Sequence, residues 1–376
     1  MVDDRRGHGQ AYFQYGGPTI KQLLKSFILQ VPGFQSLCRR LTREHVRAVM
    51  YHRFSPVDND PRHLGAKSFA RQLAYLGANH VVWTPDQHLD AVITGNADAV
   101  RPPVVVTVDD GYRDFHDVAF PLLQKYGVTA MVFVTSGFIA GHNWFWWDRL
   151  SWLLENAPDG EREWRFAKTV LRGDAGCRAM RDRLWNTIAD EFRFMPDQST
   201  EAALTQMAAQ CGLTLPDDPP PQYAAMSWDQ VRKLAAAGLG IGAHTVTHPI
   251  LSRVNGRRAR DEISGSRRAL NENLEQSTDW FCYPQGGPAD YTADTVAAVH
   301  EAGFRGCYTA YQNPTHDGNP LTLPRYSISG DFDHFRWVMC GAEYLFMRFK
   351  ASLGGNTLPG KSYWAGHNPK KDGAAT

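Results

Sequence analysis

Two short polar motifs, each placed at the end of an apolar run, constrain the fold of this chain more than any other feature. Residues 107–111 read Thr-Val-Asp-Asp-Gly and end the run 104–108, while residues 244–248 read His-Thr-Val-Thr-His and follow the run 239–243. Short apolar runs bounded by proline or glycine are typical of buried parallel strands. Because a β/α barrel gathers functional groups at the carboxyl ends of its strands, we expect an α/β fold, a distorted (β/α) barrel, with both motifs at that end.

Alternating strand-like and helix-like segments support this fold class along most of the chain. Strands are expected at residues 47–51, 80–83, 104–108, 129–135, 239–243, 280–283 and 305–309, and helices at 67–76, 117–126, 229–237, 257–274 and 292–302. The alternation of strands and helices stops between residues 141 and 226. Aromatic and charged segments there predict a helical insertion between the two motifs rather than a separate domain. The expected organisation is an N-terminal helical segment (1–43), a barrel (44–330) that contains the insertion (141–226), and a C-terminal helix with a flexible tail (331–376).

The two motifs together also predict a metal site. The i, i+4 spacing of His244 and His248 can turn both imidazoles toward one ion. With one carboxylate they form a facial ligand set that leaves positions open for water and substrate, as catalytic sites require. The second carboxylate then lies beside the metal as a base, which indicates a hydrolase. Each half alone is weak evidence, because adjacent aspartates often cap a helix or form a solvated turn, and the chain has 14 histidines.

The same motifs resemble the first two motifs of the polysaccharide deacetylases, the NodB-homology or carbohydrate esterase 4 family. The similarity extends to three further stretches, at residues 49–53, 121–130 and 281–286, and runs from about residue 46 to residue 329. It implies a barrel of the NodB-homology type. It also implies a metal-dependent hydrolase that removes an N-acetyl group from an N-acetylated sugar in a polysaccharide, a glycolipid or a related glycoconjugate.

Other functions remain open at this point. An O-deacetylase or an N-deformylase would use the same machinery, and a non-catalytic carbohydrate-binding protein could keep the same fold. The intact aspartate and histidine positions favour the enzyme, because a binding module has no need of a base beside a metal. The tryptophans of residues 144–152 could stack on sugar rings, but for most of them we expect simple packing of the insertion.

The resemblance assigns the metal ligands and the base. Asp110, His244 and His248 are expected to hold a divalent metal. Zinc is the expected ion because histidine and carboxylate ligands suit it, although cobalt, nickel or manganese could substitute. Asp109 is expected to take the proton of the attacking water. Successive strand residues point to opposite faces, so the two aspartates share one site only if the strand ends there, and Gly111 permits that turn.

The resemblance also assigns His52 as the general acid. Most relatives carry this histidine in a C-terminal motif, and no such motif follows Leu323 in this chain. His52 ends the first expected strand, as in a branch whose barrel order is circularly permuted and which includes poly-N-acetylglucosamine deacetylases. An amine leaves poorly unless it is protonated, so the reaction needs such an acid. The alternative for His52 is a buried structural imidazole.

Tyr283 and Arg325 complete the expected site. Tyr283 lies in a Tyr-Pro-x-Gly motif, where relatives use a backbone N–H to hold the oxyanion of the tetrahedral intermediate. Arg325 could orient Asp109 through a forked ion pair, and a structural or surface ion pair is an equal alternative. The chain departs from the family pattern at Cys282 and Gln285. These departures put the shape of the sugar subsite in question more than the chemistry.

Charge and cysteine usage narrow the possible partners. The 376 residues carry a formal net charge of +1, and no basic stripe with interleaved aromatic residues indicates nucleic-acid binding. The 6 cysteines are scattered without CxxC spacing, which predicts reduced and mostly buried thiols. The expected partner is therefore a carbohydrate substrate. No oligomeric state is predicted.

The apolar residues near the N-terminus do not predict a signal peptide. Residues 20–30 are interrupted by lysines and stopped by Pro32, which indicates an amphipathic helix. This segment and residues 335–349 could lie on an anionic bilayer, but we expect them to pack against the barrel. The sequence thus predicts a cytoplasmic protein whose contact with a membrane is at most peripheral.

Overall fold

The computed structural model describes residues 19–354, except residues 59, 61, 143, 167–168 and 275–277. These residues fall into two compact units. The barrel unit comprises residues 19–139 and 226–354, and the insertion unit comprises residues 140–225. The flexible tail expected at the C-terminus lies outside the described residues.

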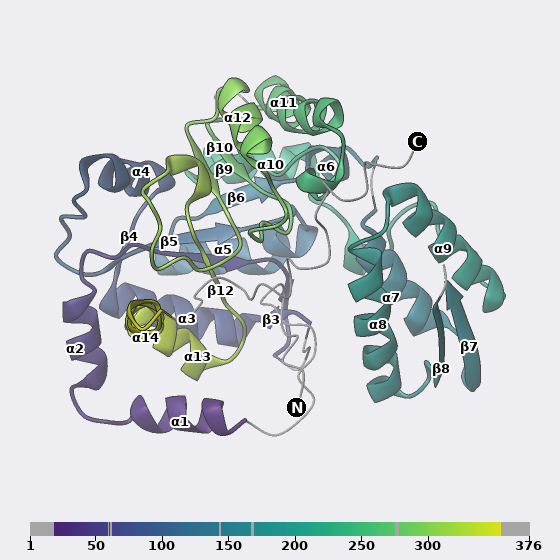
Figure 1. Cartoon of the computed structure of the whole chain (residues 1–376), viewed down its shortest axis with the longest axis horizontal. Coiled ribbons are helices and arrows are strands. Elements are labelled where there is room, and N and C mark those ends of the chain that lie inside the picture. The colour runs from purple at the N-terminus through teal and green to yellow at the C-terminus, as the bar shows by residue number, and fades with distance from the viewer. Residues whose placement is uncertain are drawn as a thin grey trace. The chain divides into compact units, whose positions relative to one another are not determined.

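The barrel unit is built on a curled parallel sheet (Figure 1). Its strands run in the order β11-β10-β9-β6-β5-β1-β12, and β4 pairs with the first residues of β5. Their bounds are β1 Arg47–Tyr51, β4 Val81–Val82, β5 Pro103–Val108, β6 Met131–Val134, β9 Gly240–Ala243, β10 Trp280–Cys282, β11 Gly306–Tyr308 and β12 Tyr326–Ser327. This architecture confirms the predicted α/β class and the distorted barrel of the NodB-homology type.

The first strand lies beside the last one. β1 pairs in parallel with β12 through Val49 and Tyr326, as expected for a permuted strand order. Just before β12, Leu323 exchanges backbone hydrogen bonds with β11 and the residue after it: its N–H donates to Cys307, and its carbonyl accepts from Thr309. The short segment 323–327 therefore connects β11 at one edge of the sheet with β1 near the other edge.

Helices follow the strands in the rhythm that the sequence predicts. In the barrel unit they are α3 Ala66–Asn79, α4 Pro85–Thr94, η1 Phe115–Ala119, α5 Phe120–Tyr126, α6 Ser136–Ile139, α10 Trp228–Ala236, η3 Leu251–Arg253, α11 Gly256–Asn273, α12 Ala293–Glu301 and η4 Pro320–Thr322, with the small sheet β2 Phe54–Ser55 and β3 Leu64–Gly65. Ser227 caps α10 through a reciprocal pair with Gln230, which satisfies backbone N–H groups at the helix start. The long helix α4 and the short helices α6, η3 and η4 have no counterpart among the expected helices.

Side chains fill the inside of the barrel. Every residue of β5 is buried, because a parallel strand in the middle of such a sheet is covered on both faces. One interior cluster joins Ala48, Val105, Phe133 and Tyr308 from four strands. Packing of this kind holds the strand ends, and the loops that follow them, in fixed relative positions.

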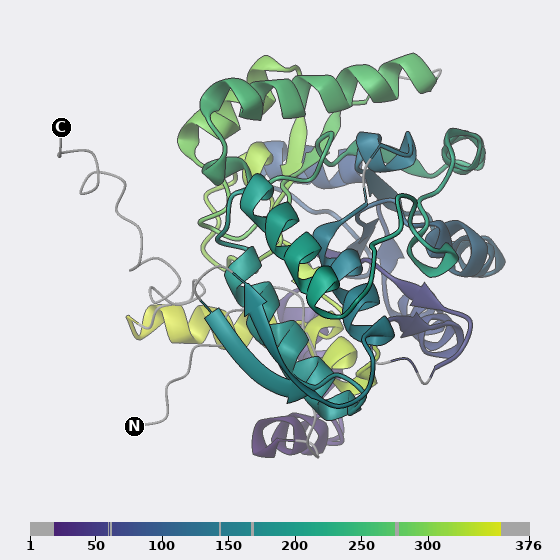
Figure 2. The same cartoon turned by 90° about the vertical axis from the view of Figure 1, so that its right-hand side faces the viewer.

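The insertion unit has its own hydrophobic core. It consists of α7 Trp146–Asn156, the antiparallel hairpin β7 Glu161–Phe166 and β8 Thr169–Asp174, α8 Arg178–Phe192, α9 Asp197–Gln210 and η2 Pro221–Tyr223. Figure 2 shows the hairpin strands side by side. The three long helices match the predicted helical character, whereas the hairpin was not expected. Trp164 is fully buried in this core, and Trp146, Trp147 and Trp152 pack against it.

Four terminal helices of the barrel unit pack together. They are α1 Ile20–Ile28, α2 Phe34–Leu41, α13 Phe332–Met339 and α14 Ala342–Ser352. Leu29, Cys38, Trp337 and Cys340 form the buried centre of the group. Helix α1 packs on this group through the Lys25–Glu343 ion pair and the partly buried Ile28. Its remaining large apolar side chains, Ile20, Leu23, Leu24 and Phe27, are each more than half exposed. No helix among the described residues is long and apolar enough to cross a membrane.

Candidate metal and catalytic site

The site is formed by loops that leave the carboxyl ends of β5, β9 and β10. Among the described residues, four that are not glycine have positive φ: Asp110 (77°), Thr245 (63°), His248 (62°) and Gln285 (57°). All four lie in these three loops. Left-handed backbone costs a non-glycine residue about 1 kcal/mol or more, and it persists where the surrounding structure fixes a functional geometry.

The turn after β5 places both aspartates at one end of the barrel. Asp109 still belongs to the sheet, because its N–H donates to the carbonyl of Tyr51. Asp110 and Gly111 then take positive φ, and a Cβ on Gly111 would lie 2.8 Å from Ile139 Cδ1. The strand therefore ends between the two carboxylates, as expected, and both are buried.

Asp110, His244 and His248 converge on one point. Asp110 Oδ1 lies 3.6 Å from His244 Nε2 and 3.5 Å from His248 Nε2. All three candidate ligand atoms lie within 4.8 Å of one another. The residues expected to bind a metal are thus brought together as predicted.

The donor set fits a divalent cation. His244 Nδ1 lies 2.7 Å from the carbonyl of Cys282, which makes Nδ1 the protonated nitrogen and leaves the lone pair of Nε2 facing the cluster. Burial lowers the pKa of both His244 and His248, which favours the neutral imidazoles that metals require. One carboxylate and two neutral imidazoles suit zinc and the neighbouring first-row ions.

A second cluster shares His244 with the first one. Asp109, His244 and Cys282 also present three possible ligand atoms to one another. Burial raises the pKa of the Cys282 thiol well above its usual range, so the thiolate that a metal needs is disfavoured. The Sγ atom instead lies 2.9 Å from Arg325 Nη2 and 3.6 Å from Asp109 Oδ2. The first cluster is therefore the better metal site.

A glutamate on α11 binds the loop that carries both histidines. Glu262 is buried, and its Oε2 accepts hydrogen bonds from the N–H groups of Val246 (2.9 Å) and Thr247 (2.8 Å). Its Oε1 accepts from Thr247 Oγ1 at 2.5 Å. Within the loop, Thr245 Oγ1 accepts from the N–H of His248. Glu262 thus fixes the backbone between the two metal ligands.

Asp109 is paired with Arg325. Arg325 Nη1 and Nη2 donate to its two oxygens at 2.8 and 2.7 Å, and Arg325 is completely buried. The guanidinium also donates to Thr107 Oγ1 and to the carbonyl of Thr309. Burial alone would raise the pKa of Asp109, but the charge and hydrogen bonds of Arg325 outweigh it and lower that pKa. Asp109 is therefore an ionised carboxylate in a fixed orientation. Its forked ion pair with Arg325 is buried rather than on the surface.

His52 lies next to this pair. Its Nε2 is 3.9 Å from Asp109 Oδ2. Burial lowers the pKa of His52 to about 4, although Asp109 opposes the shift. The following residue, Arg53, is anchored by a 2.6 Å ion pair with Asp114 and lies over the ring of Tyr112. These contacts tie the end of β1 to the loop after β5, and they bring His52 beside Asp109 as expected.

The role expected for Tyr283 does not fit this geometry. Its N–H donates to the carbonyl of Tyr308 in the sheet, and its ring is buried in a stack on Tyr291. Pro284 has no N–H, so the next amide along the loop is that of Gln285. Among the described residues that N–H makes no hydrogen bond.

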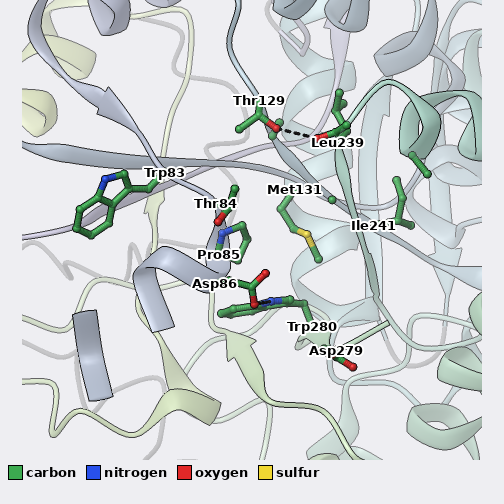
Figure 3. Close-up of a pocket in the computed structure, with 14 residues that line it drawn as sticks. Trp83, Thr84, Pro85, Asp86, Thr129, Met131, Leu239, Ile241, Asp279 and Trp280 are labelled. Atoms are coloured by element: carbon green, nitrogen blue, oxygen red, sulfur yellow. Dashed lines mark hydrogen bonds between the residues drawn. The ribbon is translucent and has the colours of Figure 1, made fainter. Parts of the chain in front are cut away.

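A separate cavity of about 290 Å³ lies at the other end of the strands. Its lining includes Met131, Gly240 and Trp280, which are the first residues of β6, β9 and β10. Figure 3 shows the indole of Trp280 beside Asp86, to which its Nε1 donates at 3.2 Å. Because the metal ligands follow the carboxyl ends, this cavity is not part of the site.

Sequence reasoning missed Glu262, Thr107 and the carbonyl of Cys282. A glutamate on a polar helix gives no local signal that it will contact a loop 15 residues away. Thr107 lies inside the strand, where nothing in the local sequence indicates its contact with Arg325. The carbonyl carries no side-chain information at all. Each contact depends on how the strands and helices meet in space, which no short motif encodes.

Comparison with known proteins agrees with the family resemblance of the sequence. The profile of the family described as Polysaccharide deacetylase matches residues 96–169 and 197–307. The chain is 19% identical over 282 residues to YxkH of Bacillus subtilis (strain 168), whose assignment as a polysaccharide deacetylase is itself provisional. That match covers 75% of this chain and 70% of YxkH.

Two solved structures share the fold. IcaB from Ammonifex degensii has a TM-score of 0.52 and 18% identity, and the match covers 79% of this chain and 97% of IcaB. The Streptococcus pyogenes deacetylase PplD, solved in complex with acetate, has a TM-score of 0.50 and 18% identity, with 76% and 93% of the two chains covered. With its barrel, its two motifs and the matching profile, this chain belongs to the polysaccharide deacetylase family.

Proposed function

We propose that this protein is a metal-dependent hydrolase that removes an N-acetyl group from an N-acetylated sugar in a polysaccharide, a glycolipid or a related glycoconjugate. One observation carries the proposal. A buried carboxylate held by an arginine, Asp109, stands directly beside a three-ligand cluster, with the imidazole of His52 within 3.9 Å. This is the set of groups that hydrolysis of an amide requires.

Zinc is the metal we propose, held by Asp110, His244 and His248. When bound there, a divalent cation supplies Lewis acidity that polarises an acyl carbonyl and makes water more acidic. The ligand set would keep the cation at the barrel end, and the Cys282 carbonyl on His244 Nδ1 would keep that imidazole in the tautomer that can bind.

Asp109 acts as the base in this proposal. Its oxygens are ionised and oriented by Arg325, so a carboxylate oxygen can accept the proton of the attacking water. His52 Nε2 is close enough to Asp109 Oδ2 for that proton to pass to the imidazole. From Nε2 the proton can reach the leaving nitrogen, which departs as a neutral amine. The low pKa of His52 favours this release.

A backbone N–H that holds the developing oxyanion would stabilise the transition state. Since the N–H of Tyr283 is engaged in the sheet, we assign this role to Gln285. Its positive φ shows that the loop holds this residue in an uncommon conformation beside β10.

Removal of an O-acetyl or N-formyl group remains an alternative within the same chemistry. Both reactions need the same base and ligands, and an ester does not depend on protonation of its leaving group as strongly as an amide does. A carbohydrate-binding protein without activity would not need the buried Asp109–Arg325 pair, whose desolvation is costly. The subcellular location that we propose for this protein is the cytoplasm.

The experiment is an acetate-release assay on the chelator-treated and the zinc-restored protein. Substrates are chitooligosaccharides and nucleotide-linked N-acetylhexosamines. An O-acetylated sugar and an N-formylated sugar are assayed in parallel, with formate measured in place of acetate for the N-formylated sugar. We expect zinc-dependent acetate release from an N-acetylated substrate, lost in His52→Ala and kept in the control His300→Ala on the exposed side of α12. Release from only the ester or the formamide, or none from any substrate, would contradict the proposed function.

A further inference from the structure

Helix α1 turns its apolar face away from the protein. Lys25 forms a 2.9 Å ion pair with Glu343 of α14 and lies over the ring of Trp337, so the polar side of the helix is the packed side. The opposite side carries Ile20, Leu23, Leu24 and Phe27, with exposed fractions of 87%, 55%, 57% and 72%. These positions lie within about one third of the helix circumference. A surface helix normally points such a stripe at the core.

The neighbouring helices expose apolar residues as well. Leu37 and Leu41 lie one turn apart on α2, and both are more than half exposed. On α14 and just beyond it, Phe346, Phe349 and Leu353 have the i, i+3, i+7 spacing of one face, and each is more than half exposed. We call these nine residues on α1, α2 and α14 the terminal-helix surface. Figure 1 shows the three helices together on one side of the barrel unit.

Basic residues accompany this surface. Residues 19–44 contain five basic residues and one acidic residue, Glu44, although the whole chain has a formal net charge of only +1. Lys21, Arg40 and Arg43 are exposed, and so are Arg348 and Lys350 on α14. The one acidic residue of α14, Glu343, is already paired with Lys25. The local excess of positive charge is complementary to an anionic surface.

We propose that the terminal-helix surface docks on an anionic phospholipid bilayer. Helices that lie in the membrane interface typically expose leucine and phenylalanine side chains next to lysine and arginine. The long aliphatic stems of lysine and arginine let their charges remain at the headgroups while the apolar side chains enter the acyl region. A protein partner fits less well, because lysine is depleted from protein interfaces. The inference goes beyond the deacetylase function and does not depend on it.

The test is co-sedimentation of the purified full-length protein with vesicles. One set is pure phosphatidylcholine, and the other contains equal parts of phosphatidylcholine and phosphatidylglycerol. We expect binding to the anionic vesicles only, weakened by 0.5 M salt. The double variant Leu24→Ser, Phe27→Ser should bind at least about tenfold more weakly, because two large apolar side chains no longer enter the bilayer. Lys21→Glu with Lys350→Glu should weaken binding to a similar degree.

Matched controls are Ile93→Ser on α4 and Phe194→Ser in the insertion unit, with exposed fractions of 68% and 58%. Both should bind like the wild type, and all variants should keep the same Tm because the substituted side chains are exposed. Absence of binding to anionic vesicles would overturn the proposal. So would equal binding to pure phosphatidylcholine, unchanged binding of the Leu24 and Phe27 variant, or a stable dimer that this variant dissociates, since a second copy would then cover the surface.

Discussion

Asp109 and Asp110 are neighbours in the chain, but the structure gives them different surroundings. Asp109 is held by Arg325, whereas Asp110 faces the two histidines. Asp109→Asn should lower kcat by about 10²–10⁴ and leave zinc bound, because the amide cannot accept a proton. Asp110→Asn should weaken zinc binding itself. Calorimetric zinc titration beside the acetate assay checks both variants, and the reverse pattern would mean that their roles are exchanged.

Glu262 is expected to act through the histidine loop rather than on the substrate. Glu262→Ala removes three hydrogen bonds to residues 246 and 247, and it should weaken zinc affinity by about 10–100-fold. Glu262→Gln keeps one carbonyl oxygen for the two N–H groups and should recover part of that loss. Glu272→Ala, at an exposed position of the same helix, is the control. Unchanged zinc affinity in Glu262→Ala would show that the loop needs no support from α11.

His80 should make the protein less stable in acid. It is 1% exposed, and burial, followed by the charge of Arg47, lowers its pKa from 6.5 to about 3. The unfolded chain therefore binds more protons between these two values, so stability is full above pH 6.5 and falls as the pH is lowered toward 3. From pH 7 to pH 5 the loss amounts to about 2 kcal/mol.

Urea unfolding of His80→Gln at both pH values checks this expectation. The variant should lose about 2 kcal/mol less than the wild type on acidification, whatever its stability at pH 7. His300→Gln, an exposed histidine on α12, should keep the wild-type difference. An identical pH difference in His80→Gln and the wild type would contradict the burial argument.

Among the elements, the pairing of β1 with β12 brings together the proposed base, its arginine partner and the proposed acid. It brings Arg325, the residue before β12, beside Asp109 at the end of β5. Arg325→Met would leave a buried carboxylate without its partner, so we expect the free energy of unfolding to fall by about 3 kcal/mol or more. Urea unfolding measures this, and Arg305→Met, which breaks exposed ion pairs, should cost about 1 kcal/mol or less.

A double-mutant cycle separates the pair from its surroundings. Asp109→Asn combined with Arg325→Met should be less destabilising than the sum of the two single changes, because each removes the charge that the other would leave unpaired. Additive losses would mean that the buried forked pair contributes little to stability.

Elements with a clear period were predictable and short ones were not. The strands 47–51 and 104–108 and the helices around 229–237 and 257–274 agree with the structure within one or two residues. β12 has two residues and gives no periodic signal, yet it lies in the segment that connects β11 with β1. The hairpin of the insertion unit was missed because its strands lie among charged residues, where apolar alternation is weak. Both depend on partners distant in the sequence.

At the scale of the whole molecule, the site was predictable because its ligands are grouped in two motifs at strand ends. The expected metal ligands, base, acid and orienting arginine all lie close together. What the sequence could not resolve is where backbone groups point, as at Tyr283, and which side of a helix faces outward. The apolar pattern of α1 gives the position of its stripe but not its direction, since that depends on the Lys25–Glu343 pair far along the chain.

The decisive measurement for zinc-dependent deacetylation is a zinc titration of the chelator-treated protein, with zinc content and acetate release measured on the same samples. We expect acetate release from an N-acetylated sugar to rise with added zinc and to saturate at one ion per chain. A variant with His244→Ala and His248→Ala should neither bind that equivalent nor release acetate. Full activity after removal of the metal, or one bound zinc per chain in the double variant, would contradict this expectation.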